Sequence, residues 1–391
     1  MIFMKLIFSM LLIVSAFCFA KERDDKALYE THQDFSGNDK EYLVTDISGV
    51  NHSRDIDAYN PLYHTLPIRQ DTTNTCWCFC TTSFFETELN RLGHGTFKLS
   101  RMYTVYWEYV EKVRRFVQLK GESLVDEGSQ PNAVINRMKQ YGAVRASDYS
   151  GLLNGQTVHN HRAMHKEITA YLDYVKEKGI WQEDQVIANV RMIMDRHIGK
   201  PPKEITVGGA SMTPKRFLDD ILQLPLDNYV SIMSFKKPGF WAKDAYDVPD
   251  NWWNSKEYYN VPLDDFYSSL KGAIKNGYSL VIAGDVSEPG KYGWHDLGFV
   301  PSFDIPSDHI NQESREFRFY NKTSTDDHGM HLIGYNRFEG EDWFLIKDSA
   351  SSAWKGEFDG YHFFHQDYIK LKILVYVAHK DAVEILLKKI E

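Results

Sequence analysis

The chain has 391 residues, of which 43% are hydrophobic and 14% aromatic, and its formal net charge is −9. The aromatic content excludes a disordered chain, and the negative charge argues against nucleic-acid binding driven by electrostatics. This length predicts one large or two medium domains with an ample core.

The first 20 residues are typical of a secretory signal peptide. One positive charge precedes an apolar stretch from Leu6 to Phe19, and Ala20 stands before a charged run that begins at Lys21. Cleavage after Ala20 would give a secreted or periplasmic protein. The apolar stretch is short for a membrane span of about 20 residues, so we expect no stable membrane insertion. A lipid anchor on Cys18 is the less favoured alternative, because the bulky Phe17 precedes it.

Residues 21–63 are polar and predict an N-terminal surface segment, which is followed by a helical lobe over residues 64–150. The first helix of this lobe is expected to begin at Cys76. Apolar residues then recur at helical spacing, and Gly93 ends the helix.

Two more helices are expected in the same lobe. One covers residues 100–119, and the other has Pro131 in its first turn and ends before Gly142. A proline in the first turn and a glycine beyond the end are the usual boundaries of a helix.

Residues 151–276 predict a mostly helical insertion, with helices over residues 162–178 and 182–197. Residues 277–391 predict a β lobe, because they contain strand-like runs that begin at Ser279, His331, Trp343 and Leu371. A helical first half followed by a stranded second half predicts an α+β fold with segregated layers.

The positions of the cysteines limit the kinds of site that they can form. Cys76, Cys78 and Cys80 lie within five residues, which is not a disulfide framework for a secreted protein. The cluster is compatible with a nucleophile, a redox site or a metal site. On a helix, positions 76 and 80 share a face while position 78 points elsewhere, which makes three metal ligands at this spacing awkward. We therefore expect no metal and no cofactor.

The spacing between Gln70 and Cys76 predicts an acyl-transfer site. Cys76 would be the nucleophile at a helix N-terminus, where the helix dipole favours a thiolate. The Cys76 backbone N–H and the Gln70 side-chain amide would stabilise the oxyanion.

His328 is the best-placed base among 15 histidines, because it stands at the start of an apolar strand. Twenty residues later, Asp348 follows a second strand and could accept a hydrogen bond from the imidazole, which would fix its tautomer. Taken alone, each residue has a plainer explanation: a surface histidine at a strand start and an aspartate in a turn.

Together these residues resemble the papain-like cysteine peptidases, and within that group the branch of bleomycin hydrolase and bacterial aminopeptidase C. The family's glutamine matches Gln70, and its Cys-Trp-Ala-Phe signature matches Cys76-Trp77-Cys78-Phe79, with Cys78 in place of alanine. The family's His-Ala and Ile-Lys-Asn-Ser runs match His328-Gly329 and the segment from Ile346 to Ser349.

The resemblance also implies substrate-binding residues. Gly128 and Ser129 match a Gly-Gly segment that lines the family's substrate cleft, and Trp77 follows the nucleophile. We therefore expect these three residues to contact the substrate.

The fold that the resemblance implies has two lobes: a helical lobe, then an antiparallel β lobe, with a large insertion between them. Cys76 and His328 are 252 residues apart, against about 130–150 in the simple papain pattern, and the excess falls in the insertion. The implied function is a secreted cysteine peptidase that hydrolyses peptides or proteins through a thioacyl-enzyme intermediate. Aminopeptidase specificity stays open, because the chain ends at Glu391 without the long C-terminal arm of bleomycin hydrolase.

Two departures from the family bear on catalysis. Asp348 stands where the family usually has asparagine, and its charge would favour the imidazolium form of the histidine. Ala350 replaces a tryptophan that shields the orienting hydrogen bond, so we expect the histidine–aspartate pair to be exposed to water. The alternatives are a non-catalytic peptide-binding protein of the same fold and, less favoured, a thiol redox or metal protein.

Overall fold

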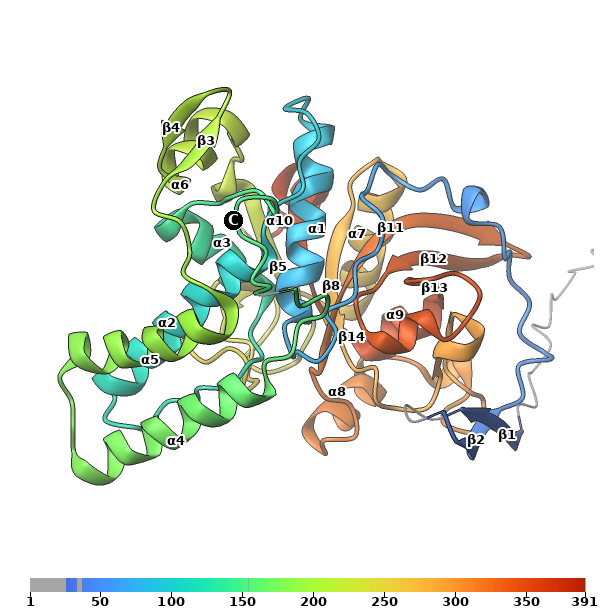
Figure 1. Cartoon of the computed structure of the whole chain (residues 1–391). Coiled ribbons are helices and arrows are strands. Elements are labelled where there is room, and N and C mark those ends of the chain that lie inside the picture. Colours follow the sequence, from blue (N-terminus) through green and yellow to red (C-terminus); the bar gives the residue numbers. More distant parts are fainter. Residues whose placement is uncertain (1–25, 34–36, 154, 391) are drawn as a thin grey trace, which may run out of the picture. The chain divides into compact units, whose positions relative to one another are not determined.

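The computed structural model describes residues 26–33, 37–153 and 155–390. The predicted signal peptide and Cys18 lie outside the described residues. The chain divides into two units at residues 50 and 51, and each is described by itself. In the first unit, β1 (Ala27–Gln33) and β2 (Asp39–Thr45) form an antiparallel hairpin (Figure 1).

The second unit combines α-helices with one large sheet, and some of these helices pack on the sheet while others pack mainly against one another (Figure 1). Their bounds are α1 (Cys76–Arg91), α2 (Arg101–Gln118), α3 (Pro131–Tyr141), α4 (Arg162–Lys178), α5 (Glu183–Ile198), α6 (Pro214–Arg216), α7 (Leu263–Lys275), α8 (Gln312–Tyr320), α9 (Gln366–Lys372) and α10 (Glu384–Leu387). None of the helices in the described part of the chain has the length and apolar character that a membrane span requires.

The large sheet has ten strands, and most neighbours pair antiparallel. Their order across the sheet is β6 (Ala242–Asp244), β7 (Tyr258–Asn260), β5 (Tyr229–Met233), β14 (Ile373–His379), β8 (Leu280–Gly284), β11 (His328–Phe338), β12 (Glu341–Lys347), β13 (Tyr361–His365), β10 (Leu297–Gly298) and β9 (Lys291–Tyr292). The pairs β5–β7 and β10–β13 are parallel. A separate hairpin joins β3 (Ile205–Val207) and β4 (Ala210–Met212).

Helix α1 lies between helices α2 and α3 on one side and strands β8 and β11 on the other (Figure 1). It is buried on nearly every face, including its carboxylates. The Glu86 side chain accepts hydrogen bonds from the Thr65 hydroxyl and the Leu99 backbone N–H. Glu88 is held by Arg91, one turn further along the helix. These partners satisfy charges that would otherwise be costly to bury.

A close approach of backbones seats α1 against β11. A Cβ added at Gly329 would lie 2.9 Å from the Cys80 sulfur and 3.5 Å from the Trp77 Cα. The glycine that follows His328 thus lets the strand carrying the histidine touch the helix that begins at Cys76.

The mixture of elements confirms the predicted α+β class. The predicted domain boundaries remain a prediction, but the sheet crosses one of them: β5 belongs to the predicted insertion, yet it pairs with β14 of the β lobe. At the end of the predicted surface segment, Tyr59 is fully buried. An insertion that supplies a sheet strand is not a separate module.

Candidate active site

Cys76 is the first residue of α1, and its side chain is partly exposed. The first N–H groups of a helix have no acceptor within the helix. The Cys76 N–H therefore lies where an oxyanion would need a donor, and the helix dipole favours negative charge there. This position agrees with the one predicted for the nucleophile.

His328 begins β11, and Asp348 directly follows β12. The two strands pair antiparallel, which brings their facing ends together. His328 Nε2 lies 2.6 Å from Asp348 Oδ1, and both side chains are buried. This contact leaves the other ring nitrogen, Nδ1, for a second partner.

Cys76 and His328 line the same pocket. Burial alone would lower the pKa of His328, but the charge of Asp348 and the charge and hydrogen bond of Cys76 raise that pKa to about 10. Burial would raise the pKa of Asp348, but Lys291 and His328 hold it well below its usual value. The site therefore favours an imidazolium held between a carboxylate and a thiol.

Two residues that the sequence analysis did not single out complete this group. Lys291, the first residue of β9, places its Nζ 2.6 Å from Asp348 Oδ2 and is almost fully buried. His362, on β13, places its Nε2 3.5 Å from the same oxygen. Neither has a spacing to Cys76 or His328 that sequence reasoning could have used.

The expectation that Ala350 leaves the histidine–aspartate pair open to water is wrong. The Asp348 side chain is 0% exposed, and His328 is 7% exposed. Lys291 on β9 and His362 on β13 pack against the carboxylate, and the Ala350 N–H donates to Asp348 Oδ1. Cover thus comes from other strands rather than from a side chain at position 350.

Gln70 is buried and held at both ends of its amide. Its Nε2 donates to the Thr73 carbonyl oxygen at 2.8 Å, and its Oε1 accepts from the Ser349 hydroxyl at 2.8 Å. Its backbone N–H also donates to the Ser349 carbonyl oxygen. The glutamine is therefore tied to the residue that follows Asp348, and its oxyanion role stays a prediction.

The three predicted substrate-binding residues occupy different places. Trp77 and Ser129 line the pocket that contains Cys76, but the Trp77 indole donates to the Glu127 carbonyl oxygen and the Ser129 hydroxyl donates to Glu108. Gly128 is not among the residues that line this pocket; its carbonyl oxygen accepts from Lys112. Substrate contact by the three residues remains a prediction.

The pocket has an acidic side that sequence reasoning missed. Asp250, Asp326 and Asp327 line it together with Gln130. Burial raises the pKa of Asp326 to about 7. The side chains that meet here come from segments far apart in the sequence, and short-range patterns could not have paired them.

Cys78 and Cys80 are buried thiols that bond to backbone. The Cys78 sulfur lies 3.3 Å from the Arg101 carbonyl oxygen, and the Cys80 sulfur lies 3.3 Å from the Trp77 carbonyl oxygen. Burial raises the pKa of Cys78 to about 12 and that of Cys80 well above its usual value. Thiols held in this way are poor thiolates and poor redox partners.

Comparison with known proteins shows which proteins the chain is similar to. No family model matches the chain. The aminopeptidase C of Listeria monocytogenes is 23% identical over 368 residues, covering 78% of this chain and 81% of that protein. The aminopeptidase C of Lactococcus lactis subsp. cremoris is 23% identical over 331 residues, covering 74% and 72%.

Among solved structures, PepW from Lactobacillus rhamnosis superposes with a TM-score of 0.61 at 17% identity, covering 84% of this chain and 83% of that one. At this identity the likeness concerns the fold alone. The predicted resemblance is thereby confirmed: the chain is similar in sequence to aminopeptidase C over most of its length and shares its fold with PepW.

Proposed function

We propose that this chain is a secreted cysteine peptidase in which Cys76, His328 and Asp348 cleave peptide bonds. One observation carries the proposal: His328 is bonded to Asp348 at 2.6 Å and shares a pocket with the thiol at the start of α1. A thiol, an imidazole and an orienting carboxylate in this order are what covalent acyl transfer requires.

The chemistry follows from this arrangement. The Cys76 thiolate attacks the peptide carbonyl carbon, and the oxyanion is stabilised by the Cys76 N–H and by the Gln70 amide, each donor contributing about 3 kcal/mol. His328 gives its proton to the leaving amine, which leaves a thioester on Cys76. The neutral imidazole then takes a proton from water, which attacks the thioester and releases the acid.

Activity-based labelling tests the nucleophile. An epoxide or vinyl sulfone that needs an activated thiolate should modify the wild-type protein at Cys76, as read by peptide mass spectrometry. A protein labelled at none of its thiols would instead be the non-catalytic peptide-binding alternative. Ala350 in place of the family tryptophan is the feature that favours this alternative, but the histidine–aspartate pair that the tryptophan would shield is buried.

The relatives' name suggests aminopeptidase activity, which we extend to this chain as part of the proposal. The test uses matched peptides with free and acetylated N-termini. An aminopeptidase should release single residues from the free set and leave the acetylated set intact. Internal cleavage of both sets would establish an endopeptidase instead.

We also propose export with cleavage after Ala20, on the strength of the N-terminal pattern alone. Expression of the full chain in a bacterial host, followed by fractionation and intact-mass measurement, tests it. Export should give a periplasmic or secreted species that begins at Lys21. An uncleaved chain in the cytosol would contradict export.

A further inference from the structure

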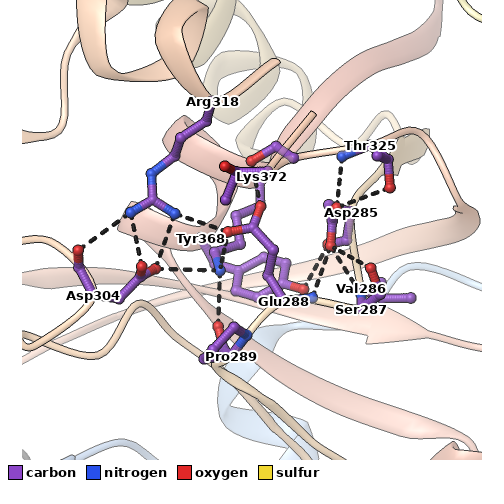
Figure 2. A network of polar contacts seen from close by, with 12 residues as sticks. Asp285, Val286, Ser287, Glu288, Pro289, Asp304, Arg318, Thr325, Tyr368 and Lys372 are labelled. Carbon is purple, nitrogen blue, oxygen red and sulfur yellow. Dashed lines mark hydrogen bonds and ion pairs between the residues drawn. The ribbon is translucent and has the colours of Figure 1, made fainter. Parts of the chain in front are cut away.

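The loop between β8 and β9 is bonded at one end to the segment that precedes His328 and at the other end to Asp348. At its start, the buried Asp285 accepts from the Thr325 backbone N–H at 2.6 Å and from its hydroxyl at 3.1 Å (Figure 2). Asp285 also accepts from the backbone N–H groups of Ser287 and Glu288, which closes a turn. One end of the loop is thus bound to the segment that leads into His328.

The middle of this loop is held by a buried ion-pair network (Figure 2). Glu288 pairs with Arg318 at 2.8 Å and with Lys372 at 3.2 Å. Lys372 also donates to the Pro289 carbonyl oxygen at 2.8 Å, and Arg318 pairs with Asp304 at 2.8 Å. Such a network leaves the loop little freedom to move.

The far end of the loop is Lys291, whose Nζ lies 2.6 Å from Asp348 Oδ2. The other carboxylate oxygen faces His328 Nε2. Lysine, aspartate, histidine and cysteine therefore follow one another, with charges that alternate in sign if the site holds a thiolate and an imidazolium.

We propose that Lys291 is a positioning residue that weakens the hold of Asp348 on the His328 proton. This inference rests on the proposed function, because it concerns proton transfer by His328. A buried carboxylate alone stabilises an imidazolium strongly. An imidazolium that holds its proton too tightly is a poor acid toward the leaving amine, and a ring that stays protonated at the working pH is not available as a base toward water. A fixed cation on the other oxygen of Asp348 reduces the stabilisation that the carboxylate gives to the imidazolium.

Other groups near the pair do not supply this charge. Burial lowers the pKa of His362 to about 3, so its ring is neutral. The hydroxyl of Tyr368 donates to the Asp285 carbonyl oxygen, and burial raises its pKa well above the usual value. Asp327 precedes His328 and Cys76 faces it, and both groups are anionic or neutral. Among these neighbours, Lys291 is the cation.

The direct test is a titration of the His328 ring by NMR in histidine-labelled protein, with the resonance assigned by its loss in His328→Gln. We expect Lys291→Met to raise the His328 pKa by about 1 or more, and Asp348→Asn to lower it by a similar amount. The double variant should lie between the two. An unchanged His328 pKa in Lys291→Met would overturn the proposal.

A rescue measurement adds a readout of turnover to the titration, which is the measurement that a merely structural role would not move. Asp348→Asn leaves Lys291 as an unpaired buried cation beside the imidazole, so kcat/KM should fall by about 100-fold or more. Adding Lys291→Met to Asp348→Asn removes that cation, and kcat/KM of the double variant should be at least about tenfold higher than that of Asp348→Asn. A double variant no more active than Asp348→Asn would contradict the proposal.

Lys271→Met is the matched control, because Lys271 pairs with Asp342 at 2.8 Å, at the opposite end of β12 from Asp348. It should leave the His328 titration unchanged. If Lys291→Met does not fold, the titration uses Lys291→Gln, which keeps a hydrogen-bond donor for Asp348 but removes the positive charge. The NMR measurement needs no turnover. If the wild-type protein hydrolyses no peptide, the proposed function is wrong, but the titration still tests the role of Lys291.

Discussion

Asp348 serves three donors with two oxygens: the His328 ring, the Lys291 ammonium and the Ala350 backbone N–H. From the sequence, Asp348 is expected to orient the imidazole and to favour its imidazolium form. Its burial adds a structural duty, since removing it would leave a buried ammonium without its counter-ion. Activity and stability are therefore coupled at this residue.

For Asp348→Ala we expect kcat/KM to fall by about 100-fold or more, because the imidazole loses its orienting partner. We also expect the free energy of unfolding to fall by about 3 kcal/mol or more, because Lys291 stays buried and unpaired. Peptide hydrolysis and urea unfolding measure the two effects. Wild-type values of both would show that Asp348 is only a turn residue.

The three cysteines should respond differently to substitution. Cys76→Ala should abolish both hydrolysis and labelling, because it removes the partly exposed thiol beside His328. Cys78→Ala should keep most activity, because that thiol is buried and bonded to the Arg101 carbonyl oxygen. A fluorogenic peptide assay on the two purified variants decides the matter. Equal losses would favour a joint role for the thiols.

At the scale of elements, glycines define where helices α1 and α3 stop. Gly93 follows α1 at φ +78°, and Gly142 caps α3 at φ +80°. The surroundings of the two differ. A Cβ at Gly93 would meet nothing within 4 Å, whereas one at Gly142 would lie 2.2 Å from the Pro214 carbonyl carbon.

This difference gives a matched pair of variants. Gly142→Ala should lower the free energy of unfolding by about 2 kcal/mol or more, because backbone strain is joined by a clash with main-chain atoms. Gly93→Ala should cost about 1 kcal/mol, from backbone strain alone. Chemical denaturation of both variants tests the comparison. Equal costs would mean that the chain near Pro214 yields freely.

Element boundaries were predictable where local chemistry marks them. The helix predicted to start at Cys76 does so, and the one predicted over residues 162–178 has the same bounds in the structure. Strands β5, β7 and β13 were not predicted, because each has five residues or fewer and lacks the uninterrupted aliphatic run that marks β8. Lys291 was missed because 57 residues separate it from Asp348.

At the scale of the whole molecule, the buried charges make stability depend on pH. The folded pKa of His328, about 10, lies above its usual value of 6.5. Its contribution is therefore fully present below about pH 6.5 and is lost as the pH rises through 10. Asp348 behaves oppositely: its folded pKa lies below the usual 3.8, so its contribution is lost as the pH falls below that value.

We expect the difference in free energy of unfolding between wild type and His328→Gln to shrink by an amount on the order of a few kcal/mol between pH 6.5 and 10. The wild type must be compared with the variant because burial lowers the pKa of Lys347 to about 7, which makes both proteins more stable as the pH rises through the same range. Denaturant titrations at fixed pH values measure it. A constant difference would show that His328 titrates normally in the folded protein.

The helix that begins at Cys76 has no solvent-facing side along most of its length. Beyond the first turn, its hydrogen-bonded amide hydrogens should then exchange with deuterium only when the whole Asn51–Glu391 unit opens. Fraying at a surface would not separate the proposed nucleophile from its neighbours, so heat inactivation and loss of structure should follow the same curve.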